Sequence, residues 1–431
     1  MKIQKINYNN KNINNNSSKM KNITTDSILK TKHNFWDFIK TTPLIKSERL
    51  SELYDAEIYI KREDLQPVRS YKIRWAFNKI SSLSDTEKKA WVVCASAWNH
   101  AQWVAITCNH LKIKGTIFMP ITTPEQKVYK TKKFWWDYID VVLIWDTFDD
   151  ALNASIDFQN KTNATYIHPF DDPKVIEWQA TVWLEVFEEI NPDFYICPIW
   201  WGGFISWQII AKNLFSPKTK IIWVEPVWAK AMKESLKSWK LIQLEHIDTF
   251  VDWAAVKKEW KLTFNICKKE NLKIIECPEN RVCTTILDYL KEDWIVVEPA
   301  WALTTDALKD LKDKIKNKKV VIVISWGNFD FERLPEIKEK SLKYEWLKKY
   351  FLVSFPQRPW ALKDFLNVLW DWDDIERFEY LKKSAKNTAP VFIWIKTNNK
   401  KHWKTIEEKM NKLWFKYKDV TNDELYFDLL V

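Results

Sequence analysis

Glycine is almost absent from this chain of 431 residues, which has four glycines but 28 tryptophans. A chain of this length ordinarily contains roughly 30 glycines, about 7% of its residues. The tryptophans and glycines together match that expectation, although each count alone departs strongly from it. The composition therefore indicates that many tryptophans stand where the backbone needs glycine.

Other absences exclude whole classes of protein. No apolar run approaches the roughly 18 residues of a membrane helix, and no apolar segment follows the N-terminus, so we expect neither a membrane span nor a secretory signal. The six cysteines form no C-x-x-C pair and no zinc spacing. We therefore expect no metal site and a reducing, cytoplasmic location. The net charge of +10 comes from lysines spread along the chain, which does not predict a nucleic-acid partner.

A turn near the middle of the chain organises our interpretation. The apolar run 194–199 predicts a buried strand, and residues 205–214 predict a helix. Between them lies Trp200-Trp201-Gly202-Gly203. A glycine-rich turn at this place binds phosphate, because its N–H groups and the helix dipole favour an anion. Two indoles would block the anion, so we interpret Trp200 and Trp201 as glycine positions.

The same pattern recurs at further expected turns, namely at Trp98, Trp135, Trp136, Trp145, Trp326 and Trp360. Trp360 follows Pro359, where a turn often requires a positive φ. We hypothesise that the gene comes from a lineage that reads UGA as glycine and was translated with a code that reads UGA as tryptophan. The alternative is a protein that is truly rich in tryptophan.

The order of apolar segments predicts the fold. Residues 1–32 are rich in Asn and Lys without periodicity, so we expect them to be disordered. Beyond them, strands alternate with helical patterns; we expect strands at 58–60, 91–94, 116–119, 141–144, 194–197, 221–224 and 320–324. This alternation predicts an α/β fold with mostly parallel sheets, in which ligands bind at the carboxyl ends of the strands.

The C-terminal part has a different pattern. A charged segment with a linker at 336–347 precedes it. Residues 348–431 then predict strand, helix, strand, strand, helix, strand, at 350–355, 361–369, 375–382, 391–397, 405–413 and from 415 onward. This order is typical of a ferredoxin-like α+β unit. It contains no evident catalytic cluster, which favours a regulatory or assembly role.

Three polar residues and the phosphate loop suit one cofactor. Lys72 has the residue type of a Schiff-base nucleophile, which needs a pKa lowered by burial or neighbours. Asn99 lies in a turn from strand to helix, and Ser325 ends the strand at 320–324. A lysine, an anion cradle and a polar group at separate strand ends are what a pyridoxal phosphate site needs.

With tryptophan read as glycine, the motifs SYKIRGA, ASAGNHAQG, HPFDDPKVIEGQATVG, GGGGFISG, EPAGA and SGGN resemble those of biosynthetic threonine deaminases. These are pyridoxal-phosphate enzymes of fold type II, the tryptophan-synthase-β type. The resemblance runs from about residue 34 to the end. FPQRPGAL at 355–362 and DDIERFEYLKK at 373–383 resemble the single ACT-like domain of the short deaminase form. The resemblance implies a two-lobed catalytic domain at 33–335 and an ACT-like regulatory domain at 348–431.

The resemblance also implies roles for the site residues. Lys72 would bind the cofactor covalently and move the Cα proton, while Ser96 and neighbouring N–H groups would hold the substrate carboxylate. Tyr71 would pack against the cofactor ring, Asn99 would bond its hydroxyl, and Ser325 would face its pyridine nitrogen. The phosphate loop would consist of Trp200, Trp201, Gly202, Gly203 and Phe204.

The activity implied is β-elimination of water from L-threonine, which gives 2-oxobutanoate and ammonia in the first step of isoleucine biosynthesis. Isoleucine would be the feedback inhibitor, and a homotetramer is expected. One alternative is a catabolic serine/threonine dehydratase or a serine racemase of the same fold, against which the C-terminal motifs count. Another is a non-catalytic amino-acid sensor that uses only the ACT-like domain, against which the intact site residues count.

Several polar residues have a structural interpretation beside a functional one. For His100 we favour a helix-start or packing role over assistance in catalysis. Glu298 either lines the site or caps a helix, and Arg358 either contacts an effector or braces a turn. Asp171 and Asp172 precede a proline and are typical of turn and N-cap residues rather than of a metal pair.

Overall fold

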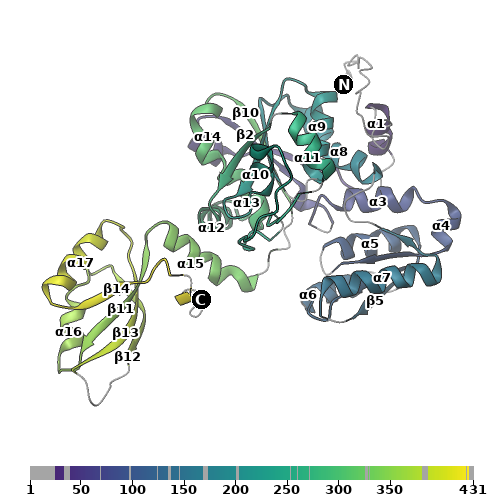
Figure 1. Cartoon of the computed structure of the whole chain (residues 1–431). Coiled ribbons are helices and arrows are strands. Elements are labelled where there is room, and N and C mark those ends of the chain that lie inside the picture. Colours follow the sequence, from purple (N-terminus) through teal and green to yellow (C-terminus); the bar gives the residue numbers. More distant parts are fainter. Residues whose placement is uncertain are drawn as a thin grey trace. The chain divides into compact units, whose positions relative to one another are not determined.

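The computed structural model describes residues 25–33, 39–67, 69–96, 99–123, 125–133, 137–144, 146–167, 173–199, 203–252, 254–259, 261–270, 272–325, 329, 331–380, 387–423 and 425–426. The chain divides into two compact units (Figure 1). One consists of Met1–Cys277 and Val296–Phe329, and the other of Pro278–Ile295 and Asp330–Val431.

The larger sheet of the first unit has six strands in the order β1-β2-β10-β7-β8-β9. They are β1 (Leu44–Lys46), β2 (Glu57–Arg62), β10 (Lys319–Ile324), β7 (Phe194–Pro198), β8 (Lys220–Pro226) and β9 (Lys273–Cys277). All neighbours are parallel except β1 and β2. The central strand β10 is a buried run of valine and isoleucine, as expected for a parallel strand covered on both faces.

The smaller sheet has the order β5-β4-β3-β6 and is wholly parallel. Its strands are β5 (Ile139–Leu143), β4 (Gly115–Met119), β3 (Val92–Ala95) and β6 (Thr165–Tyr166). A Cβ at Gly115 would lie 3.1 Å from Cys108 Sγ and 3.0 Å from Ile139 Cδ1. This close approach explains why one of the few printed glycines stands there.

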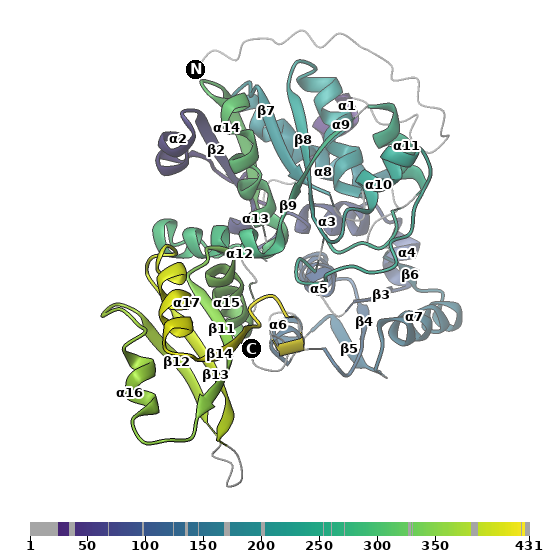
Figure 2. The ribbon, with the colours of Figure 1, turned by 60° about the vertical axis from the view of Figure 1, so that its left-hand side comes forward.

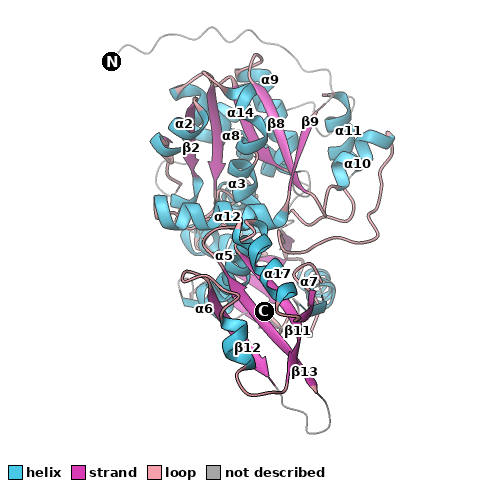
Figure 3. Cartoon of the chain, turned by 90° about the vertical axis from the view of Figure 1, so that its left-hand side faces the viewer, coloured by secondary structure: helices cyan, strands magenta, loops and turns pink. Residues whose placement is uncertain are grey.

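Helices cover both sheets (Figure 3). In the first unit they are α1 (Thr25–His33), α2 (Glu48–Tyr54), η1 (Glu63–Leu65), α3 (Ile73–Ser81), α4 (Asp85–Lys89), α5 (Asn99–Leu111), α6 (Glu125–Lys133), α7 (Phe148–Thr162), α8 (Pro173–Glu189), α9 (Gly203–Phe215), α10 (Ala231–Ser238), α11 (Lys261–Lys269), α13 (Pro299–Asp306) and α14 (Leu308–Ile315). Helix α3 packs against α8 and α5 and so lies between the two sheets (Figure 1). The predicted α/β architecture is confirmed.

The C-terminal unit contains an antiparallel sheet in the order β12-β13-β11-β14. It follows the predicted ferredoxin-like sequence of elements: β11 (Lys348–Pro356), α16 (Ala361–Leu366), β12 (Asp374–Tyr380), β13 (Thr388–Lys396), α17 (His402–Lys412) and β14 (Lys416–Asp419). Helices α16 and α17 lie on the same side of this sheet (Figure 2), and residues of both helices form a core with β11 and β13. The unit also holds α12 (Glu279–Asp288), η2 (Tyr289–Asp293), η3 (Phe331–Arg333) and α15 (Leu334–Tyr344).

The predicted disorder is wrong for residues 25–32, which belong to helix α1. This helix packs against α8. Ile28 is fully buried, and Lys32 forms an ion pair with Glu188 of α8. The apolar contact and the ion pair explain the helix, and neither is visible in a sequence without periodicity.

Tryptophan is the most frequent residue type at positive φ. Of the eleven non-glycine residues with positive φ in the described chain, six are tryptophans: Trp91, Trp239, Trp294, Trp346, Trp360 and Trp414, with φ between 53° and 70°. A bulky residue is rare in this left-handed region, where glycine is common. The positive φ predicted for Trp360 is confirmed. The other turn tryptophans, at 98, 135, 136, 145, 200, 201 and 326, lie outside the described residues.

All six cysteines are buried and unbridged. In the part of the chain that the structure describes, no helix has the length and apolar character needed to cross a membrane. Nor do the described residues include a group of three or more His, Cys, Asp or Glu side chains that is arranged to hold a metal ion.

Candidate active site

Lys72 is the N-cap residue of α3, and its side chain is only 5% exposed. Burial lowers the pKa of Lys72 well below its usual range, although the charges of Glu298 and Asp252 oppose the shift. Burial therefore shifts Lys72 toward the neutral amine. A neutral amine is the form that attacks a carbonyl, as a Schiff-base lysine must.

Ser325 lies directly after β10, at the carboxyl end of the strand, and is fully buried. Its Oγ accepts a hydrogen bond of 3.0 Å from the backbone N–H of Tyr71. The structure thus brings Tyr71, Lys72 and Ser325 together. The sequence predicted that all three serve one site.

Two other predicted residues follow β3. Ser96 is buried at the carboxyl end of this strand, and its N–H donates to the carbonyl of Phe118 over 2.9 Å. Asn99 is the first residue of α5; only its backbone is described. Both residues therefore lie at the edge of the sheet where ligands bind in such folds.

The segment proposed as the phosphate loop lies between β7 and α9. The sequence predicted this order of strand, turn and helix. Gly203 begins α9 and Phe204 follows it, with only the backbone of Phe204 described. Trp200, Trp201 and Gly202 lie outside the described residues. A helix start after a parallel strand offers N–H groups to an anion, so this junction is suited to a phosphate.

The remaining candidates have identifiable contacts. His100 is buried, and its Nε2 lies 3.1 Å from the carbonyl oxygen of Ile167, which fits the packing role. Glu298 stands at the N-cap of α13 without a capping bond from its side chain, and its charge acts on Lys72. Arg358 donates to Asp364 Oδ2 over 2.6 Å and so braces its turn. Asp171 and Asp172 lie outside the described residues.

Two indoles fill the space beside the predicted cofactor residues. The Nζ of Lys72 lies 5.2 Å from the ring centroid of Trp103, which is fully buried. The ring of Tyr71 meets that of Trp301, also fully buried, edge to face at 5.6 Å. The buried lysine and the neighbouring polar groups fit pyridoxal phosphate, and both indoles pack directly against residues that were predicted to hold it.

Sequence reasoning missed two features of this region. Asp252, whose charge acts on Lys72, follows an irregular segment without a recognisable motif. Buried ion pairs around Arg74 were missed as well. Lys61 could have indicated these ion pairs, because it is a lysine within the strand Glu57–Arg62. A charged side chain that is buried in a strand requires a partner of opposite charge.

Comparisons with known proteins agree with this geometry. Residues 35–325 match the family described as pyridoxal-phosphate dependent enzyme, and residues 339–430 match the C-terminal regulatory domain of threonine dehydratase. The chain is 46% identical over 415 residues to the biosynthetic L-threonine dehydratase IlvA of Halalkalibacterium halodurans, covering 96% of this chain and all of that one. The chain belongs to the threonine dehydratase family.

Other similar proteins share the family or the catalytic fold. The biosynthetic L-threonine dehydratase IlvA of Bacillus subtilis is 45% identical, over 95% of this chain and 98% of that one. Among solved structures, threonine deaminase isoform 2 of Solanum lycopersicum is 32% identical, with a TM-score of 0.67 over 74% of this chain and 94% of that one. Maize serine racemase is 26% identical, with a TM-score of 0.65 over 74% of this chain and 98% of that one. The predicted fold type II catalytic part and the regulatory part are confirmed.

Proposed function

We propose that the protein is a pyridoxal-phosphate-dependent threonine ammonia-lyase that converts L-threonine to 2-oxobutanoate and ammonia. The observation that carries this proposal is Lys72: a buried lysine with a lowered pKa, in a turn bonded to Ser325, within a chain of this family. The match of residues 339–430 to the threonine dehydratase regulatory domain favours this activity over serine racemisation.

The residues of the chain have separable tasks in the reaction. Bound pyridoxal phosphate supplies a ring that withdraws electrons from the substrate Cα. Lys72 would hold the cofactor first and, once the substrate amine has replaced it there, would take the Cα proton onto its freed Nζ. Ser96 and neighbouring N–H groups hold the substrate carboxylate, while Tyr71 packs against the ring and Asn99 bonds its hydroxyl. The β-hydroxyl would leave as water with the proton that Lys72 took from Cα, and the released enamine would react with water to give 2-oxobutanoate and ammonia.

Ser325 makes elimination the favoured outcome. A serine hydroxyl does not enforce a positive pyridine nitrogen as an aspartate would, so the ring withdraws electrons less strongly. Negative charge at the substrate Cα is then short-lived, which favours prompt loss of the β-hydroxyl. Proton transfer through Lys72 contributes about 10²- to 10⁴-fold to the rate, the usual range for general acid–base catalysis.

The C-terminal unit serves regulation in this proposal. Residues 33–335 form the catalytic domain, 336–347 the linker and 348–431 the ACT-like domain, which binds isoleucine as a feedback inhibitor. The enzyme acts as a homotetramer in the first step of isoleucine biosynthesis. A cytoplasmic location accords with six buried thiols that form no disulfide.

We further propose that the natural protein carries glycine at most of the printed tryptophan positions, because its gene reads UGA as glycine. Six tryptophans at positive φ support this, since the left-handed region costs a side-chain-bearing residue about 1–2 kcal/mol. The indole N–H groups of Trp183, Trp223 and Trp394 are buried without an acceptor among the described residues. A buried indole N–H usually has a partner, so these sites are poor places for tryptophan.

The same proposal accounts for the crowded site. Glycine at 103 and 301 would open the space beside Lys72 and Tyr71 that a cofactor ring needs. Each overpacked site costs about 1–3 kcal/mol, whereas a domain has only about 5–15 kcal/mol of stability. We therefore expect that a protein with tryptophan at all of these positions would neither fold nor bind the cofactor.

The test uses the natively decoded protein, meaning the chain with the residues that its own ribosomes insert, as identified by mass spectrometry. We expect 2-oxobutanoate from L-threonine, inhibition by isoleucine, and loss of both activity and cofactor absorbance in Lys72→Ala. Serine racemisation without deamination would instead support the alternative of the same fold. If the protein bound no cofactor, the result would instead support the alternative of a non-catalytic amino-acid sensor.

A further inference from the structure

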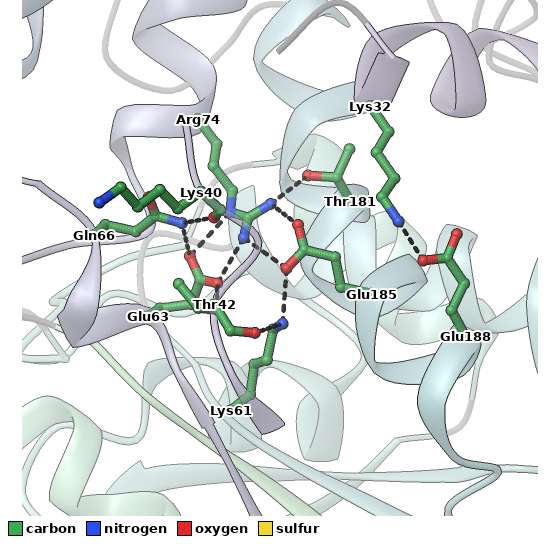
Figure 4. Close-up of polar contacts among 10 residues, drawn as sticks. All are labelled: Lys32, Lys40, Thr42, Lys61, Glu63, Gln66, Arg74, Thr181, Glu185 and Glu188. Carbon is green, nitrogen blue, oxygen red and sulfur yellow. Dashed lines mark hydrogen bonds and ion pairs between the residues drawn. The ribbon is translucent and has the colours of Figure 1, made fainter. Parts of the chain in front are cut away.

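A buried cluster of charged side chains lies beside the turn that carries Lys72. We define the Arg74 cluster as Lys61, Glu63, Arg74 and Glu185, all less than 5% exposed (Figure 4). Lys61 belongs to β2, Glu63 to η1, Arg74 to α3 and Glu185 to α8. None of the four is a proposed substrate or cofactor contact.

Arg74 is the centre of the cluster, and each of its five N–H groups has an acceptor. Toward Glu63, Nε donates to Oε2 over 2.9 Å and Nη2 to Oε1 over 2.7 Å. Toward Glu185, Nη1 donates to Oε1 over 2.5 Å and Nη2 to Oε2 over 2.9 Å. Nη1 also donates to Thr181 Oγ1 over 3.1 Å. Two paired contacts of this kind fix the plane as well as the position of a guanidinium.

The cluster extends to the segment before β1. Lys61 Nζ lies 2.7 Å from Glu185 Oε2 and donates to the carbonyl of Thr42 over 2.5 Å. The hydroxyl of Thr42 donates to Glu63, and Gln66 Nε2 donates to the carbonyl of Lys40 over 2.7 Å. Charged contacts thus tie together β2, η1, α3, α8 and residues 40–42.

The charges within the cluster balance, with two cations and two carboxylates. Burial opposes the charged form of Arg74, but Glu185 and Glu63 outweigh it and raise the pKa of Arg74. Burial likewise opposes ionisation of Glu185, yet Arg74 and Lys61 lower the pKa of Glu185. Removal of one member would leave an uncompensated buried charge, so the cluster tolerates little displacement.

Arg74 is only two residues beyond Lys72. In the same turn, Arg74 N–H donates to the carbonyl of Tyr71 over 3.1 Å, and Ile73 N–H donates to that of Ser70 over 3.4 Å. We propose that Arg74 is a positioning residue: the cluster fixes the first turn of α3 and thereby sets where the Lys72 side chain begins. The bond from Tyr71 to Ser325 holds the same turn from its other end. This inference rests on the proposed role of Lys72.

The test compares Arg74→Lys with a matched control in the natively decoded holoenzyme. Lysine keeps the charge but cannot make the two paired contacts. A reactive group displaced by about 1 Å can lose about 10²-fold in rate. We therefore expect a fall of about 10²-fold in kcat, little change in KM for threonine, and altered visible circular dichroism of the bound cofactor.

Arg62→Lys is the control. Arg62 donates to both oxygens of Asp64 over 2.8 Å, in a pair that includes neither α3 nor the cluster. We expect this variant to keep the kcat and the circular dichroism of the parent. Glu185→Gln is the second cluster variant, should Arg74→Lys fail to fold, and we expect from it the same spectral change and a smaller loss of kcat.

Two results would overturn the proposal. One is a cluster variant with the kcat and spectrum of Arg62→Lys. The other is a loss of kcat explained by unfolding, with an unchanged spectrum and unchanged cofactor affinity in the folded fraction. The spectrum and the cofactor titration need no substrate. If the parent protein deaminated no threonine, the proposed function would fail while these two measurements still tested the position of Lys72.

Discussion

The backbone N–H of Tyr71 donates a hydrogen bond of 3.0 Å to Oγ of Ser325, a residue 254 positions away in the sequence. The bond joins the lysine turn to the carboxyl end of β10. A serine hydroxyl can accept one bond and donate another. Ser325 therefore holds the turn and keeps its own O–H available, in the proposed site, for the pyridine nitrogen of the cofactor.

Ser325→Ala removes the acceptor of a buried N–H. We expect the apoprotein to lose about 1–3 kcal/mol in unfolding free energy, because an unsatisfied buried donor carries that cost, and the holoenzyme to lose activity. Urea unfolding and a deamination assay measure the two effects. Ser82→Ala, which removes an exposed hydroxyl bonded to the carbonyl of Lys79, is the control and should change neither. Equal stability of the two variants would refute the structural role.

Lys72→Met tests the lowered pKa of Lys72 through the pH dependence of stability. Below the ordinary lysine pKa of 10.5, the unfolded apoprotein binds a proton that the folded protein disfavours. The stability of the parent therefore rises with pH up to about 10.5, and methionine removes this dependence. We expect the variant to be the more stable at neutral pH, with a difference that shrinks toward pH 10.5. A difference independent of pH would contradict the lowered pKa.

A single tryptophan tests the glycine hypothesis at a helix end. Trp414 follows α17, with a φ of 62° and an 89% exposed side chain. In a chain with glycine at all other tryptophan positions, glycine at 414 should be more stable than tryptophan by about 1–2 kcal/mol. Trp372 is the control, because it is 76% exposed but its φ is not positive. Glycine at 372 should give no gain, since it adds entropy to the unfolded chain.

Lys348→Met tests the regulatory unit. The side chain of Lys348 is fully buried and pairs with Glu339 of α15 and Glu376 of β12. Its removal takes the buried cation away from both carboxylates and leaves Glu376 with only the more exposed Lys396, so we expect about 3 kcal/mol less stability in this unit. Hydrogen exchange in β11 and β12 measures that loss. Isoleucine inhibition should weaken, while kcat without isoleucine is retained.

The matched control for Lys348 is Lys396→Met. Lys396 lies 3.5 Å from the same Glu376, but its side chain is 39% exposed. A surface pair contributes about 0–1 kcal/mol, so this variant should resemble the parent in stability and in isoleucine inhibition. Inhibition that is equally strong in both variants would refute a role of the buried pair in regulation.

The sequence contained enough to predict the central strands of both parallel sheets and the ferredoxin-like order of strands and helices from β11 to β14. It did not predict α12 or η2, which belong to the same C-terminal unit. Val320 to Ile324 and Ile221 to Val224 are apolar runs whose type and length indicate buried strands. It missed β9, because Lys273 and Glu276 interrupt the pattern there. It also missed helix α1, which is held by contacts with α8 rather than by its own periodicity.

In the candidate site, too, some features were predictable from the sequence and others were not. Residue types in motifs pointed to Lys72 and Ser325, because chemistry restricts which side chains suit a lysine-bound cofactor. The bond between Tyr71 and Ser325 and the paired contacts of Arg74 were not predictable, since they depend on how distant segments pack. Neither a hydrogen bond from a backbone N–H nor the paired contacts of a guanidinium group produce a periodic pattern in the sequence.

The central claim is that pyridoxal phosphate is bound to Lys72 in a protein whose phosphate loop is lined by glycine. Borohydride reduction of the natively decoded holoenzyme, followed by peptide mass spectrometry, tests it in one measurement. The account predicts a phosphopyridoxyl group on Lys72 and the mass of glycine at positions 200 and 201. A label on another lysine, or intact indoles at 200 and 201, would contradict it.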